Sequence, residues 1–158
     1  MKTSLYAGVA GIALLAAGAA NAEGHLMFAP GEGAFSWDSF EAFAADNDLS
    51  GQTLSITGPW TGADADLMNS VAAYFEEATG ATVNYSGSDS FEQDIVISIQ
   101  ANSPPNIAVF PQPGLASDMA GRGALTPLPE GTADWIRENY AAGQSWVDLG
   151  TYANEDGE

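Results

Sequence analysis

The pattern of hydrophobic and polar positions is clearest between residues 53 and 80. Apolar and polar side chains alternate over residues 53–57, which is the period of a strand with one buried face. Gly58-Pro59 ends this run, because proline has no N–H to donate to a neighbouring strand. Apolar positions then recur at helical spacing over residues 63–79, and Gly80 is a stop signal. The pattern predicts a strand, a tight turn and a helix.

Two further strand–helix pairs follow in the same order. Residues 82–85 form the next expected strand, and residues 91–101 carry a helical stripe of apolar side chains, although their β-branched residues would also suit a strand. Residues 106–110 are a short apolar strand of the kind buried on both faces, and residues 115–120 form a short helix. Strands that alternate with helices favour a parallel sheet with right-handed crossovers. We therefore expect an α/β fold.

Finer features of these helices can be read from the same pattern. In the helix at residues 63–79, Leu67 and Val71 belong to the apolar stripe, and Glu76 and Glu77 are expected to face water. The candidate capping residues of the helices are Asp38 with Glu41, Thr61, Asp64, and Asp89 with Glu92.

Weaker patterns lie on both sides of this region. Residues 36–46 read as a short amphipathic helix whose aromatic side chains either pack on the main domain or carry Trp37 to a ligand cleft. Residues 125–129 read as extended and residues 133–140 as a helix. Residues 146–152 read as the start of a strand.

Composition narrows the function. The 158 residues include 21 acids and 3 bases, for a formal net charge of −18, and 46% of residues are hydrophobic. A folded chain follows from this hydrophobicity, and binding to nucleic acid or anionic lipid is disfavoured because no basic surface can form. The acidity itself suits solubility or a salty habitat. The chain has no cysteine, which excludes disulfides, thiol chemistry and lipid attachment at a cysteine.

The first 22 residues have the features of a secretory signal peptide. Lys2 supplies a positive start, residues 5–20 are apolar, and Ala-Asn-Ala at residues 20–22 is a cleavage site. A membrane anchor is the alternative, but the apolar run is shorter than the ~20 residues that a span needs. We expect export, cleavage after Ala22 and a mature chain that is not inserted in the membrane.

A calcium-loop pattern at residues 46–51 is incomplete. Its oxygen-bearing residues and its glycine match the first half of such a loop. The twelfth position is Thr57, where the loop needs a glutamate, and this residue lies within the first predicted strand. A turn explains the same residues, and we expect no metal there.

Catalytic patterns are weak throughout. His25 is the only histidine and lies near the predicted cleavage site. The sequence has no G-x-S-x-G, no P-loop and no G-x-G-x-x-G after a strand. Acids are plentiful, but none stands at a strand end beside another acid, as a two-carboxylate glycosidase would need. We expect neither catalysis nor a cofactor, with a small secreted glycoside hydrolase as the alternative.

The turns after the predicted strands carry the residue types of a small-molecule site. Trp60 and Thr61 follow the first strand, Ser88 and Asp89 the second, and Gln112 the third. The carboxyl ends of parallel strands share one edge of a sheet, where ligands bind. An indole can stack on a sugar ring while carboxylates and amides bind its hydroxyls. The alternatives are a core tryptophan at residue 60 and a simple turn residue at 112.

Three segments carry a family resemblance. They are G-P-W-T-G at residues 58–62, F-E-E-A-T-G at residues 75–80 and P-P-N-I-A-V-F-P-Q-P-G at residues 104–114. These segments resemble the family 1 extracellular solute-binding proteins of ABC importers, and within that family the alpha-glucoside-binding periplasmic type. The resemblance extends over residues 25–152.

The resemblance implies one periplasmic-binding-protein-like lobe at residues 51–158, incomplete and without its second lobe, after a leader at residues 23–50. It implies a monomeric periplasmic protein that closes on a sugar and delivers it to the permease subunits of an ABC importer. By family pattern, the ligand contacts are Trp60, Thr61, Ser88, Asp89, Gln112 and Pro113. Because hinge closure needs two lobes, we expect this chain, read as an N-terminal fragment or a truncated gene product, to bind sugar weakly or not at all. A protein for another solute, such as a polyamine, iron or phosphate, is the alternative.

Overall fold

The structure, a computed structural model, describes residues 26–153, so the predicted signal peptide lies outside the described part. In chain order the elements are α1 (Trp37–Asp46), β1 (Thr53–Gly58), α2 (Ala63–Thr79), β2 (Thr82–Gly87), α3 (Phe91–Gln100), β3 (Ile107–Ala108), α4 (Pro113–Gly121), α5 (Thr132–Asn139) and α6 (Gly143–Gly150). None of the helices within residues 26–153 is long and apolar enough to cross a membrane.

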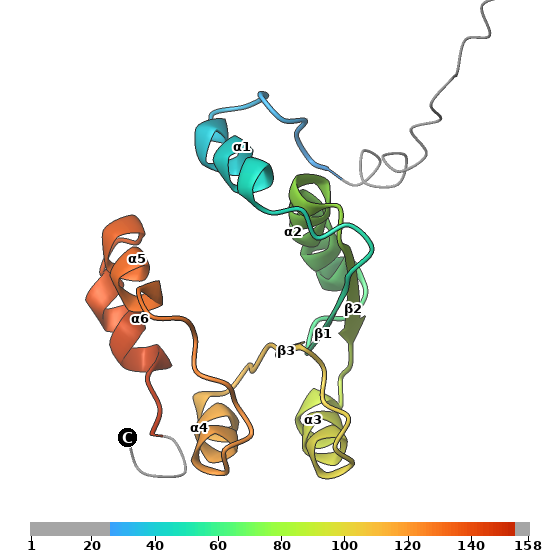
Figure 1. Ribbon diagram of the computed structural model, residues 1–158. Helices are drawn as coiled ribbons and strands as arrows, with labels where there is room; N and C mark the ends of the chain where they lie inside the picture. Colours follow the sequence, from blue (N-terminus) through green and yellow to red (C-terminus); the bar gives the residue numbers. More distant parts are fainter. Residues whose placement is uncertain (1–25, 154–158) are drawn as a thin grey trace, which may run out of the picture.

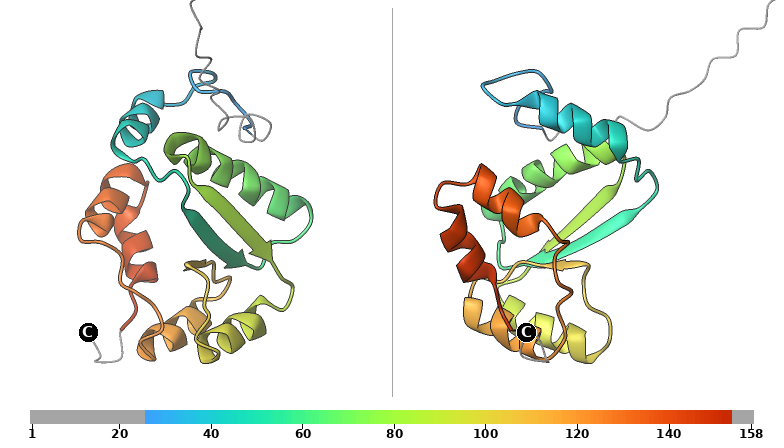
Figure 2. Two further views of the ribbon diagram at one scale, coloured as in Figure 1. Left: turned by 45° about the vertical axis from the view of Figure 1, so that its right-hand side comes forward. Right: turned by 60° about the vertical axis from the view of Figure 1, so that its left-hand side comes forward.

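The three strands form one parallel sheet in the order β2-β1-β3 (Figure 1). β1 and β2 pair from Thr53 opposite Thr82 to Gly58 opposite Gly87. Helices connect the strands, and Figures 1 and 2 show α1 and α2 toward one end of the molecule, with α3 and α4 toward the other. The prediction of an α/β fold with a parallel sheet is confirmed.

The core draws on four of these elements. Its buried apolar residues are Ile56 of β1, Ala72, Ala73 and Ala78 of α2, Phe91 and Ile95 of α3, Ala116 and Met119 of α4, and Ala81. Leu67 and Val71 of α2 are 57% and 66% exposed, so their expected place in the buried stripe is wrong. The small residues of α2 allow it to lie close to the sheet, and this sets which face is buried.

The link from α2 to β2 depends on Glu76, which was expected to face water. Gly80 ends α2 in the left-handed conformation, at φ 70°, and its N–H donates to the Glu76 carbonyl oxygen. The Glu76 side chain is half-buried, and its Oε1 accepts the Val83 N–H at 2.6 Å. The expectation for Glu76 is therefore wrong, whereas Glu77 is exposed.

The predicted side-chain caps are wrong for all three helices concerned. The residues at the N-cap positions of α1, α2 and α3 are Ser36, Gly62 and Ser90, and none makes a side-chain capping bond. Asp38 and Asp64 already lie in the first turns of α1 and α2, whereas Asp89 precedes the N-cap residue of α3. Acids inside the first turn still interact favourably with the helix dipole.

The strand at residues 106–110 is shorter and more exposed than predicted. β3 has two residues, pairs only with β1 among the described strands, and leaves Ile107 44% exposed. Before it, Asn106 replaces the ladder with side-chain bonds, because its Oδ1 accepts the Ser55 N–H at 2.9 Å and its own N–H donates to Ser55 Oγ at 3.0 Å. Because Ile107 is exposed and Ala108 is only half-buried, this strand is not buried on both faces.

The helix α1 packs on α2, as the amphipathic interpretation predicted. The Phe43 and Phe75 rings lie 6.2 Å apart, and the Trp37 and Tyr74 rings 6.1 Å apart. Trp37 also donates its indole N–H to the Glu32 carbonyl oxygen at 2.7 Å. Trp37 thus belongs to an aromatic contact between leader and helix, and its alternative role in a ligand cleft receives no support.

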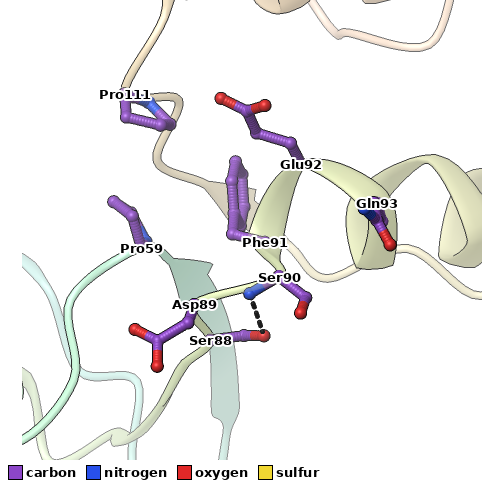
Figure 3. Close-up of a pocket in the computed structure, with 8 residues that line it drawn as sticks. All are labelled: Pro59, Ser88, Asp89, Ser90, Phe91, Glu92, Gln93 and Pro111. Carbon is purple, nitrogen blue, oxygen red and sulfur yellow. Dashed lines mark hydrogen bonds between the residues drawn. The ribbon is translucent and has the colours of Figure 1, made fainter.

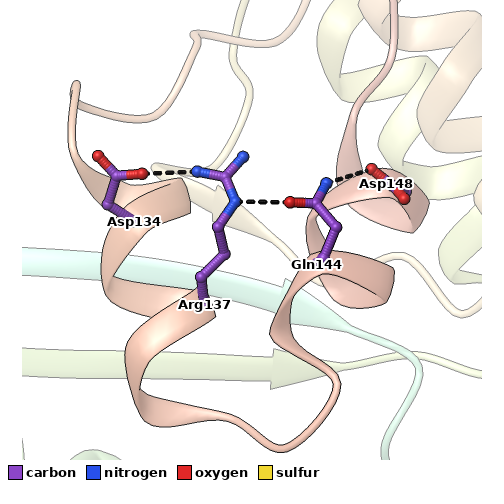
Figure 4. A network of polar contacts seen from close by, with 4 residues as sticks. All are labelled: Asp134, Arg137, Gln144 and Asp148. Atoms are coloured by element: carbon purple, nitrogen blue, oxygen red, sulfur yellow. Dashed lines mark hydrogen bonds and ion pairs between the residues drawn. The ribbon is translucent and has the colours of Figure 1, made fainter.

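The predicted strand at residues 146–152 is wrong, because residues 143–150 form α6. Arg137 of α5 donates to Gln144 Oε1 at 2.7 Å, and Gln144 donates to Asp148 Oδ1 at 2.6 Å (Figure 4). Gln144 and Asp148 are four residues apart, a spacing at which side chains meet only on a helix. Arg137 also pairs with Asp134 at 2.6 Å, so the network joins α5 to α6.

Candidate ligand site

The turns after all three strands meet at one hollow of about 260 Å³. Pro59 follows β1, Pro111 follows β3, and residues 88–93 form the turn after β2 and the start of α3 (Figure 3). The predicted convergence of these turns at one edge of the sheet is therefore present. The position follows from parallel pairing, which brings the carboxyl ends of the strands together.

Ser88 and Asp89 lie in the hollow, and both are held by neighbouring groups. The Ser88 hydroxyl donates to Asp94 Oδ2 at 2.6 Å and accepts the Ser90 N–H at 3.1 Å. Asp89 Oδ1 accepts the Thr61 hydroxyl at 3.3 Å. This last bond joins the turn after β1 to the turn after β2. Thr61 does not line the hollow itself, but it holds a residue that does.

Trp60 directly follows the lining residue Pro59 and does not fill the core. Its side chain is 39% exposed, and its ring centre lies 6.4 Å from that of Tyr85, at an interplanar angle of 34°. Trp60 is not among the residues that line the hollow. The indole is therefore exposed on a residue next in sequence to the lining residue Pro59, and the core interpretation of Trp60 is not supported.

Gln112 and Pro113 are not brought into the hollow. Gln112 occupies the N-cap position of α4 and Pro113 its first residue, a place that suits proline because its missing N–H would have no partner. Both are exposed, and neither lines the hollow. The structure thus supports the turn interpretation of Gln112.

Several lining residues were not predicted as site residues. They are Pro59, Ser90, Phe91, Glu92, Gln93 and Pro111. Phe91 is 1% exposed, and its ring meets that of Phe110 edge-on at 5.6 Å. Glu92 and Gln93 lie in the first turn of α3. A helix that follows a strand begins at the edge of the sheet where the strand ends, so the sequence could have indicated these two residues as site residues.

The electrostatics of the site favour a neutral or cationic ligand. Asp89, Glu92 and Asp94 stand at or beside the hollow. Arg122, at the C-cap position of α4, pairs with Asp118 of that helix, and Arg137 pairs with Asp134 within α5. Carboxylates accept hydrogen bonds from hydroxyl groups, and serine hydroxyls can both accept and donate them, whereas an anion would meet like charge.

The calcium-loop pattern at residues 46–51 forms a turn. Asp48 Oδ1 accepts the Ser50 N–H at 3.0 Å, and the Ser50 hydroxyl and amide together hold the pKa of Asp48 below its usual range. Thr57 lies within β1, as expected. Within residues 26–153 no three acidic, histidine or cysteine side chains are grouped as metal ligands.

Comparison with known proteins identifies the family. Residues 57–155 match the family of bacterial extracellular solute-binding proteins. The chain belongs to this family. The matched residues begin near the end of β1 and include every turn that contributes to the hollow.

The chain is similar to two named relatives. The chain is 56% identical to the alpha-glucosides-binding periplasmic protein AglE of Rhizobium meliloti, over 99% of this chain and 35% of the relative. It is 36% identical to the osmoprotective compounds-binding protein GgtB of a Synechocystis species, over 66% of this chain and 24% of the relative. The chain therefore spans about a third of the length of the first relative and about a quarter of the second.

Proposed function

We propose that this chain is the amino-terminal lobe of a periplasmic binding protein, and that it captures an alpha-glucoside or similar oligosaccharide for the permease of an ABC importer. The observation that carries the proposal is the meeting of three strand-end turns at one acidic, hydroxyl-bearing hollow. An exposed tryptophan, Trp60, follows its lining residue Pro59. Family membership and the name of the first relative support the same ligand class.

The geometry gives the residues distinct roles in this proposal. Trp60 stacks on a sugar ring, Asp89 accepts hydrogen bonds from sugar hydroxyls, and Thr61 holds the Asp89 carboxylate. Ser88 adds a polar group to the lining of the hollow. Gln112 and Pro113, predicted as contacts by family pattern, stand at the start of α4 and would need to meet the ligand outside the hollow.

The size of the hollow fits the proposal of a lobe that forms part of a larger site. Ligand pockets commonly enclose about 300–1,000 Å³, and this hollow is open and smaller, at about 260 Å³. In the proposed division of the chain, residues 1–22 are a signal peptide, residues 23–50 a leader and residues 51–158 the lobe. A second lobe would complete the site by closing on the sugar.

Sugar titration followed by NMR tests the proposal, because it detects the millimolar affinity, about −4 kcal/mol, that an open lobe can reach. Maltose, trehalose and sucrose are added to the isotope-labelled chain. We expect at least one to shift the amide signals of Ser88 and Asp89 and the indole signal of Trp60. Asp89→Asn should weaken the shifts, and Asp134→Asn, distant in α5, should not. Of the two outcomes expected for a fragment, weak binding or none, the proposal requires weak binding. Shifts scattered over the surface, or none at all, would therefore contradict it.

The same protein sample can test two alternative functions, binding of a non-sugar solute and hydrolysis of glycosides. The second relative is named for osmoprotective compounds, so glycine betaine, a zwitterionic osmolyte, is included in the titration. Shifts with betaine alone would favour a non-sugar solute. We expect no catalysis, because binding proteins hold their ligand unchanged. Turnover of chromogenic glycosides by the purified chain would instead indicate a hydrolase.

A further inference from the structure

The Tyr85 hydroxyl makes two hydrogen bonds to one residue of the proposed site. It accepts the backbone N–H of Trp60 at 3.0 Å and donates to the backbone carbonyl of Trp60 at 3.1 Å. A neighbouring strand would satisfy the same two groups with its own backbone. Trp60 lies beyond the end of β1, and the phenol takes the place of a strand partner there.

Two glycines leave the space for this contact. Gly58 and Gly87 stand opposite each other at the ends of β1 and β2. A Cβ atom on Gly58 would lie 3.0 Å from the Tyr85 hydroxyl oxygen, and one on Gly87 would overlap the Trp60 carbonyl oxygen. The backbone of Trp60 can therefore come close to β2 because Gly87 has no side chain, and Gly58 leaves room for the Tyr85 hydroxyl.

We infer that Tyr85 is a positioning residue, which holds Trp60 so that its exposed indole is in position before ligand arrives. The Tyr85 ring also lies against the indole, with 6.4 Å between ring centres. Holding a contact group in its bound position lowers the entropy lost on binding. The role in sugar binding rests on the proposed function, whereas the position of Trp60 can be measured without sugar.

The chain provides a matched control at Tyr74. Its hydroxyl accepts the backbone N–H of Phe28 at 2.9 Å and donates to the Phe28 carbonyl at 3.0 Å. Tyr74→Phe thus removes the same pair of hydrogen bonds as Tyr85→Phe, but on the leader. Trp37 lies 6.1 Å from Tyr74, between ring centres, and can report on that change.

The test compares Tyr85→Phe and Tyr74→Phe in the full chain labelled with 5-fluorotryptophan. The chain has four tryptophans, and each fluorine signal is assigned by replacing that tryptophan with phenylalanine. In the folded protein without sugar, we expect Tyr85→Phe to shift or broaden the Trp60 signal and leave Trp37 unchanged. Tyr74→Phe should do the reverse.

Sugar affinity and thermal unfolding complete the test. For a sugar that binds the wild-type chain, Tyr85→Phe should weaken binding by about two- to tenfold, the factor that lost hydrogen bonds typically give. Tyr74→Phe should not weaken it. An unchanged Trp60 signal in Tyr85→Phe, even with a lower melting temperature, would overturn the inference, because Tyr85 would then act on stability alone. If no sugar binds the wild type, the proposed function fails, and the fluorine signals still decide the position of Trp60.

Discussion

Gly87 is the residue where a single added carbon should have the largest effect on the candidate site. Its Cβ would overlap the Trp60 carbonyl oxygen, which is backbone and cannot rotate away. We expect Gly87→Ala to lower the free energy of unfolding by about 1–3 kcal/mol, the usual cost of forcing extra volume into a packed place. The midpoint of urea unfolding measures this change.

Gly114 is the control for this substitution. A Cβ on Gly114 would meet no heavy atom within 4 Å, and the residue lies in α4, where alanine is the better helix former. Gly114→Ala should therefore leave the unfolding midpoint unchanged or raise it slightly. Equal midpoints for the two alanine variants would contradict the close approach of Trp60 to β2.

At the scale of residues, the sequence could indicate which residues lie near the hollow, but not which residues they form hydrogen bonds with. Ser88 and Asp89, which were predicted as ligand contacts, line the hollow, and the sequence could place them there because position after a strand is a local property of the chain. The bond between Tyr85 and Trp60 joins residues that are 25 apart in sequence. Tyr85 stands inside a strand, where the alternation of side chains indicates a face of the sheet and nothing more.

At the scale of elements, one side chain connects α2 to the sheet. The Thr82 N–H donates to the Gln52 carbonyl oxygen, on the β1 side of β2. The N–H of the next residue, Val83, therefore points away from β1, and it donates to the Glu76 side chain. Hydrogen bonds to charged groups contribute about 1.5–3 kcal/mol. We expect Glu76→Ala to reduce the free energy of unfolding by about that amount and to speed hydrogen exchange at Val83.

Glu77 gives the matched control for this prediction. It is the next residue along α2, is exposed, and carries the same charge. Glu77→Ala should change the free energy of unfolding by less than about 0.5 kcal/mol, as surface substitutions usually do. If Glu76→Ala were as mild as Glu77→Ala and Val83 exchanged at its wild-type rate, the bond would not stabilise the edge of the sheet.

The elements were predicted best where local pattern decides the structure. The helix at residues 63–79 was predicted with its observed bounds, since apolar periodicity and Gly80 both act locally. The segment at residues 146–152 was predicted wrongly, because its alternating apolar residues suit a strand as well as a helix. What favours α6 is a network through Arg137, Gln144 and Asp148, which depends on the neighbouring helix α5.

At the scale of the whole molecule, large apolar surfaces remain open. An apolar groove of about 620 Å³ lies between α3, β3, α4 and residues 124–128. Trp135, Trp146 and Leu149 of the α5–α6 pair are each more than half exposed. Such surfaces favour association. The charge of −18 opposes it, and we therefore keep the prediction of a monomer at low salt.

The same charge makes stability depend on salt. Repulsion among 21 acids, with 3 bases, disfavours the compact state. Raising the salt concentration from ~0.01 M to ~1 M shortens the screening length from about 30 Å to about 3 Å. We expect the urea midpoint of the dilute chain to rise with sodium chloride over this range, with sedimentation confirming that it stays monomeric during the measurement.

A charge-reduced variant separates repulsion from other effects of salt. Glu41, Glu77 and Glu138 are exposed, stand on three different helices and lie outside the hollow. Replacing all three by glutamine should raise the midpoint at low salt and flatten its dependence on sodium chloride, because less repulsion is left to screen. A variant with the wild-type slope would show that the gain in salt comes from apolar burial, since salts that are excluded from protein surfaces strengthen burial whatever the charge.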